Sequence, residues 1–222
     1  MNPFSLYLVT DRSLSLVRPL VDVVREAVAG GVTCVQLREK HATSREFYNL
    51  ARALLAVTRP AGVPLIVNDR LDIALAAGAD GVHVGQSDLP PAAVRRLVPP
   101  DFIVGVSAES PADAVQAAAD GATYVAASPV FATPTKTDTA PALGLDGVAA
   151  LRAALPPACP LVAIGGIHLD NAASVLAAGA DGLAVVSEIM SGPSPRLAAS
   201  ALLNVLRAAA PSAANYPLTT NN

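Results

Sequence analysis

Short apolar runs recur along the whole chain, and each one is closed by glycine or by polar residues. A run of four or five residues that is apolar almost throughout is typical of a strand buried on both faces, as in a parallel sheet. Between successive runs, apolar residues follow helical spacing. The pattern predicts strands over residues 6–10, 33–37, 65–67, 81–84, 102–106, 124–127, 161–164 and 183–186.

The helices between these strands have recognisable ends. Pro19 suits the first turn of one helix and Gly30 follows its last residue, while Thr43 or Ser44 can cap the next helix. The pattern predicts helices over 19–29, 43–58, 71–77, 90–98, 146–154 and 195–209, and two more that begin at residues 110 and 170.

Strict alternation of strands and helices predicts one α/β domain, a single (β/α)8 TIM barrel with a parallel eight-stranded core. The junctions AAGADGVHV and AAGADGLAV, at residues 76–84 and 177–185, repeat one helix end, turn and strand. A doubly wound open sheet is the alternative, but no GxGxxG follows the first strand. We expect the barrel to span residues 1–210 and the polar segment 211–222 to form a disordered tail.

Composition narrows the class of protein. Of the 222 residues, 52% are hydrophobic and 15% are charged, and the net charge of −3 comes without any basic run, which argues against nucleic-acid binding. Cys34 and Cys159 suggest neither a disulfide framework nor a metal site. No apolar run approaches the ~18 residues of a membrane span. We expect a soluble cytoplasmic protein. The sequence leaves open whether it forms a homo-oligomer.

Two acidic residues close neighbouring strands. Asp69 follows the strand at 65–67, and Asp88 follows the strand at 81–84. Parallel neighbours end on the same rim, where two carboxylates repel each other unless a cation lies between them. The pair therefore predicts a divalent metal site, although each acid could instead cap the helix after it. We expect His83, inside the second strand, to be a hydrogen-bonded core or rim histidine.

Cations and glycines follow other strands on the same rim. Arg38, Lys40 and Lys136 could bind a diphosphate, or could be solvated turn charges. Gly165 and Gly166 let backbone N–H groups approach an anion, although they could also form a simple turn. Loops after the last two strands of such barrels commonly hold phosphate. A diphosphate leaving group beside Mg²⁺ is the chemistry that this combination suits.

Seven motifs occur in one order along the chain. They are QLREK (36–40), VND (67–69), GVHVGQSD (81–88), GVSA (105–108), SPVFATPTKT (128–137), AIGGI (163–167) and AVVS (184–187). Together they resemble the thiamine-phosphate synthase family over about residues 6–190. The resemblance implies a Mg²⁺-dependent transferase that joins 4-amino-2-methyl-5-(diphosphooxymethyl)pyrimidine to a thiazole phosphate carboxylate, releasing thiamine phosphate, diphosphate and CO2. Its reaction would pass through a pyrimidine carbocation and need no strong general base.

The resemblance also implies a role for each matching residue. The metal ligands would be Asp69 and Asp88. The catalytic residues would be Arg38, Lys40, Ser107 and Lys136. The pyrimidine diphosphate would be held by Gln36, Leu37, Arg38, Glu39, Lys40, Asn68, Ser107 and Lys136. The thiazole phosphate would be held by Thr133, Pro134, Thr135, Gly166, Val186 and Ser187.

Two other functions share much of this pattern. A thiazole tautomerase would share the barrel and the thiazole-phosphate side, but need not retain the acid pair. A non-catalytic phosphate-ligand binding barrel is the other alternative. Ser128, where the family often has glycine, and Pro134 depart from the family pattern only in loop detail. We expect the loop over 128–143 to be mobile.

Overall fold

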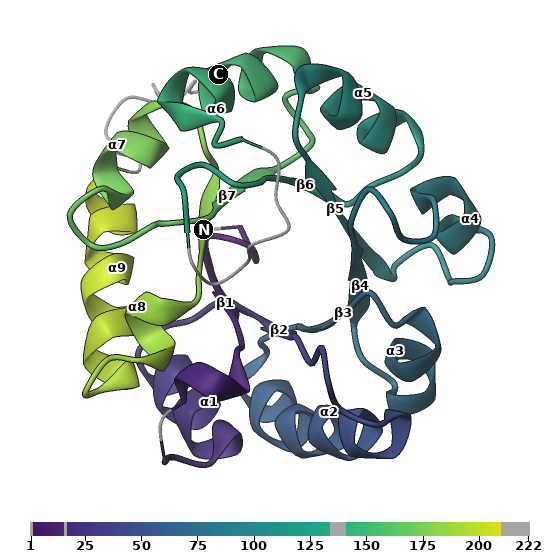
Figure 1. The fold of residues 1–222 in the computed structure, drawn as a ribbon, viewed down its shortest axis with the longest axis vertical. Coiled ribbons are helices and arrows are strands. Elements are labelled where there is room, and N and C mark those ends of the chain that lie inside the picture. Colours follow the sequence, from purple (N-terminus) through teal and green to yellow (C-terminus); the bar gives the residue numbers. More distant parts are fainter. Residues whose placement is uncertain (1, 16, 134–140, 210–222) are drawn as a thin grey trace, which may run out of the picture.

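Eight parallel strands close into a barrel in which each strand pairs with the next and β8 pairs with β1 (Figure 1). The computed structural model describes residues 2–15, 17–133 and 141–209. The strands are β1 (Leu6–Val9), β2 (Cys34–Leu37), β3 (Leu65–Asn68), β4 (Gly81–Val84), β5 (Ile103–Ala108), β6 (Tyr124–Ala127), β7 (Leu161–Ile164) and β8 (Gly182–Val185). The predicted (β/α)8 barrel is confirmed.

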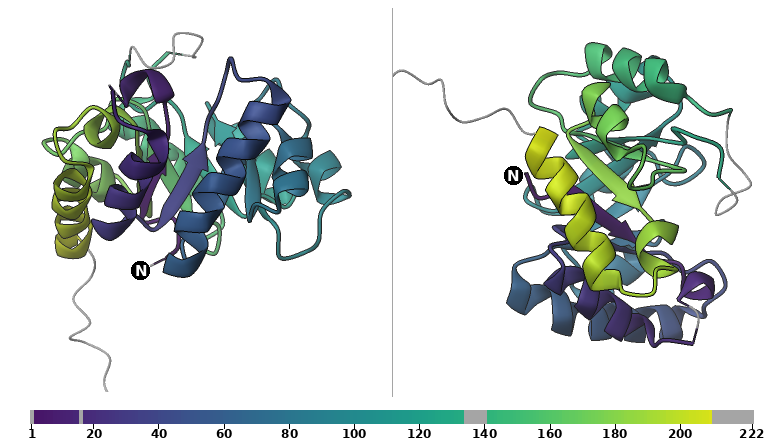
Figure 2. Two further views of the ribbon diagram at one scale, coloured as in Figure 1. Left: turned by 90° about the horizontal axis from the view of Figure 1, so that it is seen from below. Right: turned by 90° about the vertical axis from the view of Figure 1, so that its left-hand side faces the viewer.

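Helices cover the outside of the barrel, and the N-terminus and the end of the last helix lie at the same end of it (Figure 2). The helices are α1 (Leu20–Ala29), α2 (Ser44–Thr58), α3 (Leu71–Ala77), α4 (Pro91–Arg95), α5 (Pro111–Ala119), α6 (Gly144–Ala154), α7 (Ala172–Ala177), α8 (Ser187–Met190) and α9 (Pro195–Ala209), with 3-10 turns η1 (Arg12–Leu14) and η2 (Arg59–Ala61). Within the described ranges, no helix is long and apolar enough to cross a membrane.

The elements differ from the sequence prediction in a few places. Thr43 caps α2 in a full capping box with Glu46, as the sequence indicates. Ser107 lies inside β5 and not after it, because that strand continues to Ala108. The short helix α8 was not predicted as a separate element, and α4 ends at Arg95. The predicted tail, 211–222, lies outside the described residues.

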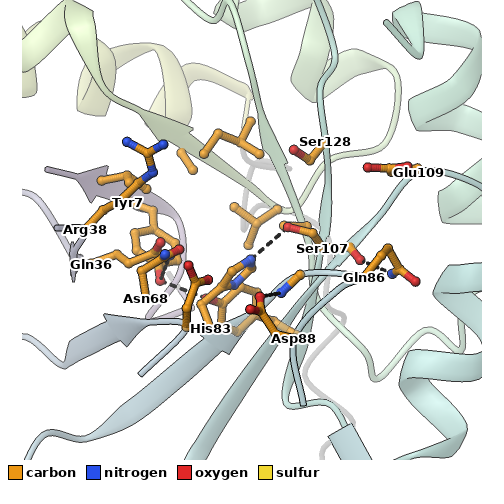
Figure 3. A pocket seen from close by; sticks show the side chains of 18 of the residues that line it. Tyr7, Gln36, Arg38, Asn68, His83, Gln86, Asp88, Ser107, Glu109 and Ser128 are labelled. Carbon is orange, nitrogen blue, oxygen red and sulfur yellow. Dashed lines mark hydrogen bonds between the residues drawn. The ribbon is translucent and has the colours of Figure 1, made fainter. Parts of the chain in front are cut away.

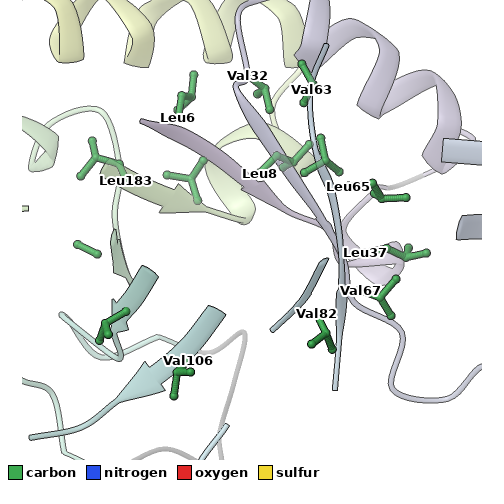
Figure 4. Packing of buried hydrophobic residues seen from close by; sticks show 14 of the residues in the cluster. Leu6, Leu8, Val32, Leu37, Val63, Leu65, Val67, Val82, Val106 and Leu183 are labelled. Atoms are coloured by element: carbon green, nitrogen blue, oxygen red, sulfur yellow. The ribbon is translucent and has the colours of Figure 1, made fainter. Parts of the chain in front are cut away.

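Side chains of each strand alternate between two apolar layers. Residues such as Leu8, Leu65 and Leu183 point outward and pack beneath the helices (Figure 4). The inner layer fills the barrel and includes two fully buried tyrosines, Tyr7 and Tyr124. This inner layer forms the floor of the cavity described below.

The residue directly before each even-numbered strand pairs with the strand before it. Its backbone N–H donates to a carbonyl of the odd-numbered strand, and its side-chain oxygen accepts the N–H of that same residue. The side-chain bonds are Thr33–Leu6 (2.9 Å), Asp80–Leu65 (2.8 Å), Thr123–Val104 (3.0 Å) and Asp181–Leu161 (2.8 Å). Threonine and aspartate alternate around the barrel, and we call these four pairs the strand clasps. They satisfy donors at strand ends that would otherwise lack partners.

Candidate active site

A cavity of about 340 Å³ opens over the C-terminal ends of β1–β8, the end at which barrels of this type bind ligands. The cavity collects most of the polar residues that the sequence singled out on the first half of the chain (Figure 3). Those that line it are Gln36, Arg38, Lys40, Asn68, Asp69, Asp88 and Ser107.

The two acids of the predicted metal site share this cavity. Asp69 has a positive φ of 64°, a conformation that aspartate tolerates better than most residues, and its N–H donates to the His83 carbonyl at 2.8 Å. Asp88 Oδ2 accepts the Gly85 N–H at 2.7 Å. Neither acid caps a helix, because the residues at those positions are Arg70 and Pro90. The capping alternative is therefore wrong for both.

Asp69, Asp88 and Lys40 interact electrostatically. Burial raises the pKa of Asp88, the Gly85 N–H opposes that rise, and the negative charge of nearby Asp69 adds to it. Lys40 Nζ lies 3.1 Å from Asp69 Oδ2 and lowers the pKa of Asp88. Two close carboxylates beside one ammonium group leave a net negative charge that a cation would neutralise.

The two carboxylates suit magnesium better than a metal that needs three or more protein ligands. No group of three or more histidine, cysteine, aspartate or glutamate side chains in the described part of the chain could hold a metal. Mg²⁺ is commonly bound by one or two carboxylates, with water and ligand phosphates completing its coordination. Asp69 and Asp88 in an open cavity fit that pattern, and the metal remains a proposal.

A buried chain of hydrogen bonds forms the floor of the cavity. Gln36 Nε2 donates to Tyr7 Oη at 3.0 Å, and Tyr7 Oη lies 2.8 Å from Tyr124 Oη. Tyr124 Oη lies 2.9 Å from His83 Nδ1, and His83 Nε2 lies 2.9 Å from Ser107 Oγ. We call these five residues the floor relay. Burial raises the pKa of both tyrosines well above its ordinary value, so both stay protonated.

A second, smaller cavity of about 80 Å³ adjoins the first and is shaped by two glycines. Gly165 and Gly166 have φ of 105° and 61°, so a residue with a Cβ would be strained at either position. A Cβ on Gly166 would lie 2.8 Å from Phe131 Cβ and 3.1 Å from the Ala132 carbonyl. The predicted thiazole-phosphate residues that line this cavity are Thr133, Gly166, Val186 and Ser187. The cavity is therefore a backbone-lined cradle of a size suited to a small anion.

Arg38 links the two cavities. It lines both of them, its backbone N–H donates to Thr10 Oγ1 at 3.1 Å, and its guanidinium lies 3.6 Å from Asp11. In Figure 3 the guanidinium extends above the cavity floor, away from the relay. A cation in this place can contact an anion in either cavity.

Several predicted site residues lie elsewhere. The Leu37 side chain is fully buried in the outer apolar layer, and Glu39 is paired with Arg12 at 2.5 Å outside the main cavity. Neither side chain reaches the cavity, whereas the sequence prediction placed all five residues of QLREK in the substrate site. Pro134, Thr135 and Lys136 lie outside the described residues.

Among the lining residues that the sequence did not predict, four have polar side chains of interest. Tyr7 and Tyr124 sit in otherwise apolar runs, where a polar aromatic residue is the signal that points to a buried partner. Gln86 donates to the Ser107 carbonyl at 2.6 Å, and Glu109 lines the same cavity (Figure 3). Nothing in the sequence spacing of Gln86 and Glu109 indicates that they line the cavity.

Comparison with known proteins identifies the family. A family model described as thiamine monophosphate synthase matches residues 6–189. The chain belongs to the thiamine monophosphate synthase family. This confirms the resemblance, and thiamine-phosphate synthases are transferases of thiamine biosynthesis.

Individual relatives agree over nearly the whole chain. The thiamine-phosphate synthase of Albidiferax ferrireducens is 52% identical over 208 residues, 94% of each chain. That of Syntrophomonas wolfei is 53% identical over 189 residues, covering 85% of this chain and 90% of the relative. The solved thiamine phosphate pyrophosphorylase from Pyrococcus furiosus superposes with a TM-score of 0.86 at 38% identity, over 95% of this chain and 98% of that one.

Proposed function

We propose that this chain joins 4-amino-2-methyl-5-(diphosphooxymethyl)pyrimidine to a thiazole phosphate carboxylate, forming thiamine phosphate, diphosphate and CO2. The observation that carries the proposal is the pair of adjoining cavities. One contains Asp69 and Asp88 beside two cations, and the other is a glycine-lined cradle, with Arg38 bordering both. Two phosphorylated substrates that must react with each other need such neighbouring sites.

In the first cavity, Arg38 and Lys40 hold the diphosphate, and Asp69 and Asp88 would hold Mg²⁺ against it. The metal, when bound, supplies positive charge that stabilises the departing diphosphate, an effect on the order of several kcal/mol. Lys40, now beside Asp69, lies close enough to contact both the acid and a bound phosphate. Bonds to the developing anion strengthen as the leaving group departs.

Bond breaking and bond making then proceed between the two cavities. The C–O bond between the pyrimidine methylene and the diphosphate breaks, and its electron pair leaves with the diphosphate. The thiazole nitrogen donates its lone pair to the resulting carbocation, the thiazole ring loses its carboxylate as CO2, and the electron pair left on the ring is taken up by a proton from solvent. Gln36, Asn68 and Ser107 orient the pyrimidine during this step. No proton needs to be removed from carbon, so the site needs no strong base.

In the second cavity, Thr133, Gly166 and Ser187 hold the thiazole phosphate. Support comes from the positive φ of Gly165 and Gly166, which turns the backbone around a space closed to larger residues. The carboxylate-bearing ring then extends toward Arg38 and the first cavity. Arg38 can pair with that carboxylate until it is lost.

The test is product formation by the full chain with both phosphorylated substrates, with and without Mg²⁺. We expect thiamine phosphate and diphosphate in equal amounts, and a loss of at least 100-fold in rate with Asp88→Asn or without metal. Asp22→Asn, on the exposed face of α1, is the matched control and should leave the rate unchanged. A tautomerised thiazole without diphosphate release, or ligand binding without any product, would reject the proposal.

A further inference from the structure

The floor relay lies beneath the proposed pyrimidine site, and only its two ends were assigned a substrate role. Its middle members, Tyr7, Tyr124 and His83, are at most 7% exposed and come from three different strands. Their polar atoms face one another across the barrel and not the surrounding apolar layer. Buried polar groups carry a cost unless all are paired, so a chain of this kind has a reason to be there.

The order of donors and acceptors in the relay follows from its first members. Tyr7 Oη has one hydrogen and two lone pairs. Gln36 Nε2 donates to one lone pair, and the Cys34 sulfur, a weak acceptor, is a hydrogen-bond neighbour of the same hydroxyl. Tyr124 Oη, at 2.8 Å, is a stronger acceptor than the sulfur, so in the order that pairs the relay best the hydrogen of Tyr7 goes to Tyr124.

The remaining bonds are then fixed in turn. Tyr124 has accepted a hydrogen from Tyr7, so its own hydrogen goes to His83 Nδ1. A neutral imidazole that accepts at Nδ1 carries its hydrogen on Nε2, and that hydrogen goes to Ser107 Oγ. The hydroxyl hydrogen of Ser107 is left for a ligand. At the other end, Gln36 uses one of its two amide hydrogens on Tyr7, and its carbonyl oxygen, held away from Tyr7, is left for a ligand.

We propose that the floor relay sets the hydrogen-bonding character of Gln36 and Ser107 together, so that Tyr7, Tyr124 and His83 are positioning residues that determine which ring is accepted. This inference rests on the proposed function. The ring must offer a donor to Gln36 and an acceptor to Ser107. An aminopyrimidine does so, with its exocyclic amine and a ring nitrogen. A ring with a carbonyl in place of the amine places an acceptor opposite the Gln36 oxygen, which is also an acceptor, so no hydrogen bond forms.

The first test measures kcat/KM for the aminopyrimidine diphosphate and for its analogue with a 4-oxo group. A site built to pair a polar substrate group rejects a mismatched one strongly, and we expect the wild-type protein to prefer the amine by at least 100-fold. Tyr124→Phe interrupts the relay at its centre without touching substrate, and Tyr7→Phe interrupts it beside Gln36. Each should reduce the preference at least 10-fold, because each end can then rotate independently.

Tyr48→Phe is the matched control, since Tyr48 lies 36% exposed on α2. It should leave the preference unchanged. A wild-type protein that forms no product from the amine would reject the proposed function itself. If product forms but both relay variants keep the wild-type preference, the relay inference falls while the function stands.

A second test reads the tautomer of His83 directly, in a protein whose relay is unchanged. Nitrogen-15 NMR of the three histidines distinguishes the two neutral tautomers, and His41→Gln and His168→Gln, at exposed positions, assign the His83 signals by elimination. We expect His83 to carry its hydrogen on Nε2 when the pyrimidine diphosphate is bound. The opposite tautomer, or an equal mixture of the two, would overturn the proposed order.

Discussion

Asp88 Oδ2 accepts a hydrogen bond of 2.7 Å from the backbone N–H of Gly85, within its own loop. The bond holds the carboxylate over the cavity and away from the start of α4. Asp88 is thus kept beside Asp69 although the two charges repel, and burial together with that repulsion raises the pKa of Asp88. A carboxylate held close to a second carboxylate is expected to lower the free energy of unfolding while it serves ligand binding.

Asp88→Asn should make the metal-free protein more stable at neutral pH. The folded chain raises the pKa of Asp88 and therefore holds its proton more tightly than the unfolded chain does. The free energy of unfolding then falls as pH rises from the unfolded value, about 3.9, through the folded value. We expect Asp88→Asn to raise the melting temperature at pH 7 by up to about 3 °C, because solvent screens a partly exposed group.

The pH dependence is the distinguishing measurement. The difference in melting temperature should shrink toward zero below about pH 4, where Asp88 is protonated in both states. Asp22→Asn, on the exposed surface, provides the comparison. A variant at Asp88 that melts lower than the wild type at pH 7 would show that the carboxylate is stabilising after all.

Gly166→Ala should specifically weaken binding of the thiazole phosphate. The new Cβ would press on Phe131 Cβ and the Ala132 carbonyl, in the segment that leads to Thr133 at the second cavity. We expect the KM for the thiazole substrate to rise at least 10-fold, while the KM for the pyrimidine diphosphate changes little.

Gly62→Ala is the control for backbone strain. Gly62 has nearly the same φ, 67° against 61°, but a Cβ there meets no atom within 4 Å. Both variants should therefore lose about 1–2 kcal/mol of stability from the left-handed conformation alone. Equal KM values for the thiazole substrate in the two variants would contradict the assignment of the cradle.

Asp181→Ala should destabilise the barrel without affecting catalysis. Asp181 clasps the N–H of Leu161 and pairs with Arg152 at 2.9 Å, at the end of the barrel opposite the cavities. Leaving a partly buried donor unpaired costs about 1–3 kcal/mol in the free energy of unfolding, measurable by urea titration. Asp101→Ala, an exposed change, should cost little. A matching fall in kcat/KM would instead tie this end of the barrel to the site.

The fold could be predicted because its signals are local. Runs such as Leu161–Ile164 are apolar throughout, and Gly78 ends α3 in the left-handed conformation that glycine favours. The apolar pattern therefore places strands and helices to within a few residues. Helix α8 was missed because a single turn carries too little pattern to separate it from the loop.

Only some of the predicted site residues face the cavity, because side chains along a strand alternate between its two faces. In and after β2, Gln36, Arg38 and Lys40 face it, whereas Leu37 and Glu39 alternate to the other side. Reading the motif as a block ignored that period of two.

The floor relay needed the three-dimensional structure. Tyr7 and Tyr124 are 117 residues apart, and only closure of the barrel brings their hydroxyl groups within 2.8 Å.

The alternation of threonine and aspartate in the strand clasps divides the molecule in two. Strands β1–β4 and β5–β8 form equivalent half-barrels, each with one threonine clasp followed by one aspartate clasp. The acids and cations Arg38, Lys40, Asp69 and Asp88 all belong to the first half, and the cradle at Gly166 and Ser187 belongs to the second. Under the proposed function, the first half holds the diphosphate and the second half holds the thiazole phosphate, while Ser107 of the second half also contacts the pyrimidine. Redesign of the cradle around Gly166 and Ser187 can therefore begin without changing the two aspartates of the first half.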